Sequence, residues 1–305
     1  MNARSAGKKP PPIKTMAVLM NMDTQPMATN SINSNYSAMV ALANLNGTAD
    51  DLQTAQTRIS TGKIVNSASD NPAVWSIAQR SRSDIAAISA ASDSLNRTRS
   101  VVDLSTAAAS QVSTLLNQIR SKVSSATDAS LDSASRTQLN TDVGNLIGQI
   151  NRTVNAASFN GVNLLKSGAT SLSALADSNG GTVAVAAEQL NVKAGGGGAA
   201  ITFSAAASFT GVTQATTLLA LVNTSITNTN AAVSKLGAAS VSLKGQSDFL
   251  STLTDSLNNG ISNLVDADIA KESANLQALQ TKQQLGVQVL QIANSSKGSL
   301  LSLFR

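Results

Sequence analysis

The chain has no histidine and no cysteine among its 305 residues. These absences exclude metal sites built on those residues, thiol nucleophiles, Ser-His-Asp triads and disulfides. Aromatic residues make up only 2% of the chain, whereas a compact enzyme of this size normally centres on several large aromatic side chains. Carboxylate, lysine or serine chemistry would remain, but no constellation of such residues is present. The sequence therefore predicts a protein that is not an enzyme and uses no cofactor or metal.

Charge is scarce and unevenly placed. The net charge is +5, but from Met27 onward only 18 basic residues face 16 acidic ones. A clustered basic surface for nucleic acid is therefore not expected, and no stretch approaches the roughly 20 apolar residues that cross a membrane. Residues 1–26, which contain KKPPP, are predicted to be a disordered basic extension, unless translation starts at Met27. A secretory signal is disfavoured, because AVLM is shorter than the apolar region of about 7–15 residues that such a signal needs.

Ala, Ser, Leu, Val, Thr and Asn dominate the composition, which suits long helices packed side by side. The first predicted helix covers about residues 31–60, and Gly62 ends it. It carries a coiled-coil seam with steps of four and three residues. The predicted seam positions are Ala38, Leu42, Leu45, Ala49, Leu52, Gln56 and Ile59.

A second helix is predicted from Pro72 to about Ala126, capped by Asp70 or Asn71. At 1.5 Å per residue it would be roughly 80 Å long, which indicates a rod. A third helix follows at about 133–156, and then SFNGVNLL predicts a hairpin turn at Asn160-Gly161.

Residues 167–211 change character and are rich in Gly, Ser and Ala, with GGGG at 195–198. The alternating pieces TVAVAA (182–187) and AAITFSA (199–205) predict a small β-rich insert. Helical periodicity returns near Thr213. A break or kink is predicted at 258–260 (NNG), and Asp266 is the predicted N-cap of a last helix.

The C-terminal stretch LQALQTKQQLGVQVLQIANSSKGSLLSLFR has large apolar residues around most of the helix circumference. Such a helix needs neighbours on most sides. The predicted fold is mainly α: a long antiparallel helical coiled-coil rod built from both termini, with a small β-rich central insert.

Three stretches resemble bacterial flagellin. They are RISTGKIVNSASDNPAVWSIAQR (58–80), SFNGVNLL (158–165) and NLVDADIAKESANLQALQTKQQLGVQVLQIANSSKGSLLSLFR (263–305). The resemblance implies a structural subunit that is exported and polymerises into the flagellar filament for swimming motility. Implied partners are other flagellin copies, the flagellar type III export apparatus and a chaperone, and hook-associated and cap proteins. The implied location is the extracellular filament.

On this interpretation the chain has six segments: an extension (1–26), an N-terminal inner coiled-coil helix (27–62), the first part of a rod domain (63–166), a variable outer insert (167–212), the second part of the rod (213–262) and a C-terminal inner coiled-coil helix (263–305). A hook-filament junction protein is the nearest alternative, and a surface polysaccharide-binding adhesin is a more distant one.

From the pattern alone, the apolar seam residues could form an intramolecular core or an assembly face, and the resemblance favours assembly. The predicted assembly interface consists of Ile32, Met39, Leu42, Leu45, Leu52, Ile59, Leu276, Leu279, Leu285, Val289, Leu290, Ile292, Leu300, Leu301, Leu303, Phe304 and Arg305.

One stretch departs from the family. In flagellins that activate a Toll-like receptor, the matching part of the long helix is Arg-rich and carries Glu-Leu. Here LNQIRSKVSS (116–125) has Gln118, Ser121 and Lys122 where Arg, Glu and Leu stand. The sequence therefore predicts weak or absent activation of that receptor.

Overall fold

The computed structural model describes residues 34–192 and 200–302, with side chains up to residue 296. The predicted extension (1–26), Ile32, the GGGG run, Leu303, Phe304 and Arg305 lie outside the described residues, as do the side chains of Leu300 and Leu301. The described chain is mainly helical, as the sequence predicts, and it separates into two compact units. Unit 1 comprises Met1–Gly62 and Ala267–Arg305, and unit 2 comprises Lys63–Asp266.

Unit 1 contains two helices, α1 (Tyr36–Thr61) and α5 (Ile269–Ser302), which pack against each other. Asn35 caps α1 by accepting a hydrogen bond from the backbone N–H of Ala38, and Gly62 ends it with φ of 70°. The left-handed conformation costs glycine little, which explains the residue at this position.

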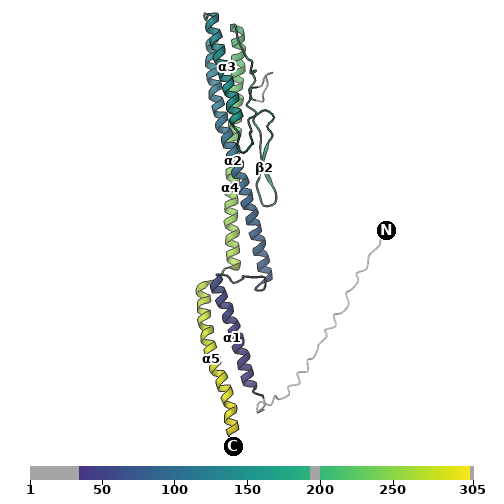
Figure 1. The fold of residues 1–305 in the computed structure, drawn as a ribbon, viewed down its shortest axis with the longest axis vertical. Helices are drawn as coiled ribbons and strands as arrows, with labels where there is room; N and C mark the ends of the chain where they lie inside the picture. The colour runs from purple at the N-terminus through teal and green to yellow at the C-terminus, as the bar shows by residue number, and fades with distance from the viewer. Residues whose placement is uncertain (1–33, 193–199, 303–305) are drawn as a thin grey trace, which may run out of the picture. The chain divides into compact units, whose positions relative to one another are not determined.

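Unit 2 is built on two long helices, α2 (Pro72–Ala126) and α4 (Val212–Val265). Figure 1 shows them side by side. Ser113 Oγ donates to Asn230 Oδ1 at 2.8 Å, and Ser240 Oγ donates to Asp103 Oδ1 at 2.7 Å. Because the α4 partner advances by ten residues as the α2 partner recedes by ten, the helices are antiparallel.

A third helix, α3 (Ser133–Ala156), packs on α2. The predicted bounds of α2 and α3 are confirmed, with Asn71 rather than Asp70 capping α2. The Asn160-Gly161 turn is also confirmed: both residues have positive φ, and Phe159 and Val162 exchange two backbone hydrogen bonds of 2.9 and 3.0 Å.

The described part of the insert contains an antiparallel hairpin. Strand β1 (Leu172–Leu175) pairs with β2 (Thr182–Val185), with Leu172 opposite Val185. The strand predicted in TVAVAA is thus confirmed, but β1 was missed and the described part of AAITFSA, from Ala200, forms no strand. Thr202 instead bonds to Ser225 and Leu221 of α4, while Phe203 is buried in the core of unit 2.

Two further predictions about helix ends are wrong. Helix α4 runs without a break through Asn258, Asn259 and Gly260, because the Asn and Gly residues only lower helix propensity and tertiary packing overrides it. Asp266 is the C-cap of α4, and Asp268 caps α5 by accepting from the N–H groups of Ala270 and Lys271. No described helix is long and apolar enough to span a membrane.

Candidate assembly surface

The two helices of unit 1 form an antiparallel pair with a fixed register. At one end Asn35 Nδ2 donates to the carbonyl oxygen of Ala293 at 2.8 Å, and at the other Arg58 Nη1 lies 3.2 Å from Glu272 Oε1. Between them Leu45 packs so close to Gly286 that a Cβ there would lie 3.1 Å from Leu45 Cδ1. The sequence predicts an antiparallel coiled coil built from both termini, and this pairing of the first and last helices is that coiled coil.

The seam of this pair is narrow and combines small or polar side chains with leucine and isoleucine. The buried and half-buried positions follow steps of three and four residues, as in a coiled coil. In α1 they include Ala38, Ala41, Leu45, Thr48, Leu52, Ala55 and Ile59, and in α5 they include Glu272, Leu276, Leu279, Gln283, Gly286, Leu290 and Ala293.

The predicted phase of the α1 seam was partly wrong. Leu45, Leu52 and Ile59 lie in the seam as expected, but Leu42 is 47% exposed and Gln56 is also exposed. Ala41 and Ala55 are buried instead. A search for large residues favoured Leu42, whereas close helix approach requires alanine at the neighbouring position.

Large apolar side chains lie on the outside of the pair. Met39 is 65% exposed and Ile292 is 67% exposed, and Leu285 and Val289 are each more than half exposed. Tyr36, Val40 and Val287 are exposed as well and were not among the predicted interface residues. At about 100° per residue, Val40 and Leu42 fall on opposite flanks of the α1 seam, and Val287 and Val289 on opposite flanks of the α5 seam. The exposed apolar residues therefore surround the pair.

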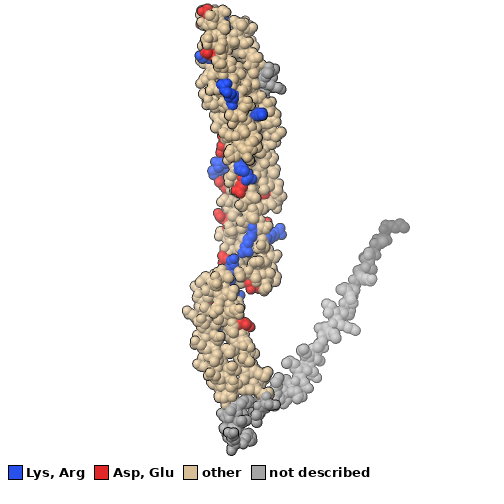
Figure 2. All heavy atoms as spheres, in the orientation of Figure 1, with Lys and Arg blue, Asp and Glu red and all other residues tan. Residues whose placement is uncertain are grey.

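The same part of the pair carries no charge. Residues 36–49 of α1 and 283–296 of α5 contain no Lys, Arg, Asp or Glu, and the contacts of Asn35 and Leu45 place these two stretches at the same level. Figure 2 shows the visible face of this stretch without charged side chains. An exposed helix surface normally carries charges opposite its apolar stripe. A charge-depleted apolar surface of this kind is typical of the buried core of an interface.

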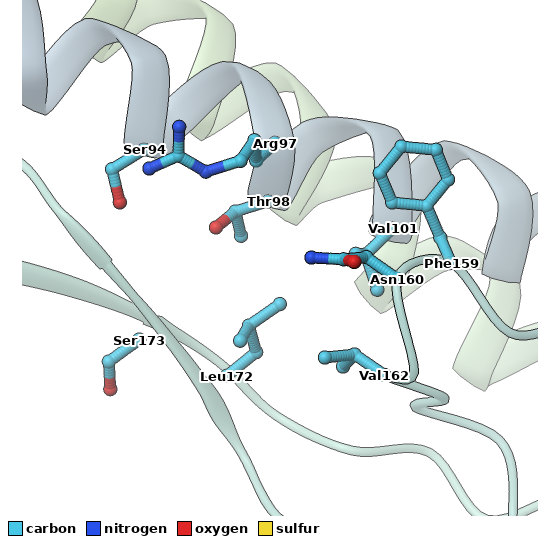
Figure 3. Close-up of a pocket in the computed structure, with 9 residues that line it drawn as sticks. All are labelled: Ser94, Arg97, Thr98, Val101, Phe159, Asn160, Val162, Leu172 and Ser173. Atoms are coloured by element: carbon cyan, nitrogen blue, oxygen red, sulfur yellow. The ribbon is translucent and has the colours of Figure 1, made fainter.

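The described part of unit 2 contains pockets lined by both polar and apolar side chains. A pocket of about 190 Å³ lies between α2, the Asn160 turn and β1. Figure 3 shows its lining, in which Arg97 is the charged residue beside hydroxyl, amide and apolar groups. The described residues contain no group of three or more side chains suited to hold a metal. Neither observation indicates a catalytic site.

The three residues of the departing receptor motif lie on the exposed side of α2. Gln118, Ser121 and Lys122 are all solvent-exposed. Lys122 Nζ lies 2.9 Å from Asp142 Oδ2 of α3, and this hydrogen bond from Lys122 lowers the pKa of the Asp142 carboxyl.

Known proteins match the chain at both ends. The bacterial flagellin N-terminal helical region matches residues 32–170, and the bacterial flagellin C-terminal helical region matches residues 219–304. Flagellin FljK of Caulobacter vibrioides is 43% identical over 279 residues, which cover 92% of this chain and all of the relative. This chain belongs to the bacterial flagellin family. The flagellin of Brucella melitensis is 39% identical and covers 90% of this chain and 99% of its own length.

A crystal structure of Bacillus cereus flagellin is 16% identical, covers 59% of this chain and 93% of its own, and gives a TM-score of 0.37. As a flagellin, the protein is a structural subunit of the flagellar filament that polymerises with its own copies and serves motility, and it is not an enzyme.

The predicted interface residues whose side chains the structure describes divide into two groups. Leu45, Leu52, Ile59, Leu276, Leu279 and Leu290 lie in the α1–α5 seam. Met39, Leu42, Leu285, Val289 and Ile292 lie outside it. The sequence analysis missed the polar seam residues Arg58 and Glu272. An ionisable residue at a seam position in each of the two helices could have indicated this pair.

Proposed function

We propose that copies of this flagellin assemble through the charge-free apolar surface of unit 1, formed by Tyr36, Met39, Val40, Leu42, Leu285, Val287, Val289 and Ile292. The observation that carries this proposal is that large apolar residues are exposed all round the pair along a stretch without charges. Burying a large apolar side chain fully contributes about 1.5–3 kcal/mol. Eight such residues, each about half exposed, would contribute on the order of 10 kcal/mol per subunit when neighbouring copies cover them.

The same surface explains why α1 and α5 need the filament. Among the described residues of unit 1, Ala41, Ala55, Leu279 and Glu272 are the buried ones. So thin a seam does not offset the conformational entropy lost on ordering two long helices. We therefore infer that α1 and α5 are disordered in the isolated chain and become ordered when neighbouring copies cover them.

Before assembly, the subunit passes unfolded through the flagellar type III export apparatus with the help of a chaperone, and it then meets hook-associated and cap proteins outside the cell. The absence of cysteine supports this route, because a chain without thiols cannot be cross-linked during transit. We also propose that, in the filament, the insert faces outward and the α1–α5 pair faces inward.

Seeded growth tests the assembly surface. Purified chain added to filament fragments should elongate them, as seen by electron microscopy. Val289→Ser and Ile292→Ser should reduce elongation strongly, because each places a hydroxyl in a buried apolar contact. The matched control is Val241→Ser in α4, where the valine is 73% exposed but lies outside the proposed surface. Normal elongation by both α5 variants, or equal loss in the control, would refute the assigned surface.

A receptor assay tests the departing motif. The triple variant Gln118→Arg, Ser121→Glu, Lys122→Leu should gain signalling in reporter cells that carry the Toll-like receptor. Because the triple variant also breaks the Lys122–Asp142 ion pair, Asp142→Asn serves as the control that breaks the pair without rebuilding the motif. Signalling by the parent chain or by the control at the level of the triple variant would contradict the interpretation.

A further inference from the structure

The chain contains four Asn-Gly dipeptides, and the structure places them in different backbone environments. They begin at Asn46, Asn160, Asn179 and Asn259, and all four asparagines are solvent-exposed. Asn46 lies in α1 and Asn259 in α4, whereas Asn160 and Asn179 lie in turns. All four sites share the Asn-Gly dipeptide and an exposed asparagine. We therefore look to the local backbone for differences in the reactivity of the asparagine side chain.

The turn around Asn179 holds one backbone amide only weakly. Asp177 Oδ1 accepts hydrogen bonds from the N–H of Asn179 at 2.7 Å and the N–H of Gly181 at 2.8 Å. The N–H of Gly180, between these two, faces the carbonyl oxygen of Asp177 across the turn at 178–179, but it makes no hydrogen bond of good geometry. Gly180 has φ of 91°, a conformation that favours glycine, and a side chain at Gly181 would displace the Asp177 carboxylate. The result is a weakly held backbone nitrogen next to an exposed asparagine amide, with no side chain to shield it.

The other three sites are held in place. In the helices the N–H groups of Gly47 and Gly260 belong to the i to i−4 hydrogen-bond ladder, and their backbone cannot rotate without unwinding a turn. Asn160 sits in a two-residue turn closed by the paired bonds of Phe159 and Val162. Its side chain lines the pocket of Figure 3 together with Thr98 and Val101 of α2. Both features restrict the approach of its amide carbon to the next backbone nitrogen.

We propose that Asn179 is a site of spontaneous deamidation in the folded protein. The backbone nitrogen of Gly180 attacks Cγ of Asn179, a new N–Cγ bond forms, and the Cγ–Nδ2 bond breaks. Nδ2 leaves as ammonia with the proton from the Gly180 amide, and a cyclic imide remains. Water then opens the imide. Cleavage of the bond to Cγ gives aspartate, and cleavage of the bond to the main-chain carbonyl gives isoaspartate.

The product changes the hairpin in two ways. Either product adds a negative charge two residues from Asp177, where like charges repel each other. Isoaspartate also lengthens the main chain within the turn that joins β1 to β2. The hairpin is tied to the rod near this turn, because Leu175 N–H donates to Ser94 Oγ at 3.0 Å and Gln246 Nε2 donates to the carbonyl oxygen of Ala176 at 2.7 Å. Subunits would thus acquire charge on the hairpin as they age.

Peptide mapping by mass spectrometry tests the proposal on the full chain. The purified protein is incubated in warm, mildly alkaline buffer, and amide-to-carboxylate conversion is followed at each Asn-Gly site. Asn179 should convert about tenfold faster or more than Asn259, because the helical site must first open its hydrogen-bonded turn. Asn160 should convert more slowly than Asn179. In strong denaturant the four sites should convert at similar rates. Asn179→Gln, which disfavours ring closure, should abolish both the ammonia release and the isoaspartate at this position.

Each outcome decides the point. Equal rates at Asn179 and Asn259 in the folded protein would show that sequence alone governs the reaction, and an intact Asn179 would show that the turn protects it; either result overturns the assignment. Faster conversion at Asn160 would overturn it too. Asn46 reports separately on the proposed function, because it should react in isolated chains, where α1 is disordered, and be protected in filaments. If Asn46 reacts equally in isolated chains and in filaments, the proposed ordering of α1 on assembly is wrong, and the result at Asn179 is unaffected.

Discussion

At the scale of single residues, Arg58 and Glu272 show how the two ends of the chain find their register. Arg58 Nη1 lies 3.2 Å from Glu272 Oε1, and the Glu272 side chain is only 11% exposed. A buried carboxylate in the seam needs a cation opposite it. If α1 and α5 paired in another register, Glu272 would be buried without Arg58 beside it, which is unfavourable. Polar seam residues are a well-attested means of fixing coiled-coil register.

Glu272→Ala should therefore weaken the helix pair in filaments. The expected loss is about 1–3 kcal/mol, below the value for a fully buried pair because Arg58 is partly solvated. Thermal depolymerisation of filaments measures it as a lowered midpoint. Arg58→Ala should lower the midpoint as well, and the double variant should lose less than the sum of the two. Additive losses would show that the two side chains do not act as a pair.

Acid sensitivity also belongs to single residues, at the corner between α2 and α3. A backbone hydrogen bond from Ser130 lowers the pKa of Asp128, and one from Ser135 lowers the pKa of Asp132, the N-cap of α3. A carboxyl whose pKa is lower in the folded state stabilises the fold above its unfolded value of about 3.9. That contribution is lost as the pH falls through the folded pKa.

Helicity of the chain titrated into acid should therefore decline below about pH 4, and Asp132→Asn should show a weaker dependence on pH in this range. Circular dichroism measures both curves. Asp255→Asn removes one negative charge from an exposed site in α4 and is the control for net charge. If Asp132→Asn and the parent chain lost helicity identically as the pH falls, the assigned role of the Asp132 cap would be contradicted.

At the scale of elements, local sequence signals predicted the helix ends and turns well, whereas the apolar periodicity did not place all the seam positions of α1 correctly. Pro72, the Asp70-Asn71 pair and the periodic apolar residues predicted both ends of α2, and Asn160-Gly161 predicted its turn, because these signals act within a few residues. The break at Gly260 and the strand near Ile201 were wrong, since both depend on distant contacts with other elements. The α1 seam was placed one residue off at Leu42 because small residues, which permit close packing, give little pattern.

Gly286 and Gly144 offer a matched test of element packing. Both lie inside helices, where glycine costs about 0.5–1 kcal/mol relative to alanine. A Cβ at Gly144 meets nothing within 4 Å, whereas one at Gly286 would lie 3.1 Å from Leu45 Cδ1.

Gly144→Ala should therefore raise the thermal stability of the isolated chain. Gly286→Ala should bring no such gain to filaments, and Gly286→Val should destabilise them by about 1–3 kcal/mol through overpacking. Thermal melts of chain and filament measure these effects. A stabilising effect of Gly286→Val would show that the seam is looser than the Leu45 contact indicates.

At the scale of the whole molecule, the two units differ in how much each can bury by itself. Unit 2 has a continuous core that includes Ile88, Leu116 and Phe209, so it can fold alone. In unit 1 the described part buries few residues, and several large apolar residues, Met39, Leu285 and Ile292 among them, are exposed. The apolar residues around most of the C-terminal helix predicted that this end needs neighbours, and the resemblance to flagellin favoured other copies as those neighbours.

The isolated chain should therefore be less helical than the filament. Helices α1 and α5 contain 26 and 34 residues, roughly a third of the residues in described helices, and circular dichroism of dissolved filaments should lose helicity in that proportion. Brief tryptic digestion of the chain should cut first after Arg58, Lys271 and Lys282 in unit 1. Arg80 in α2 is also exposed and should resist, because the helix around it is folded in the isolated chain. Equal helicity in chain and filament, together with equal cleavage at Arg80 and Lys282, would mean that unit 1 folds without its neighbours and that its outer apolar residues need another explanation.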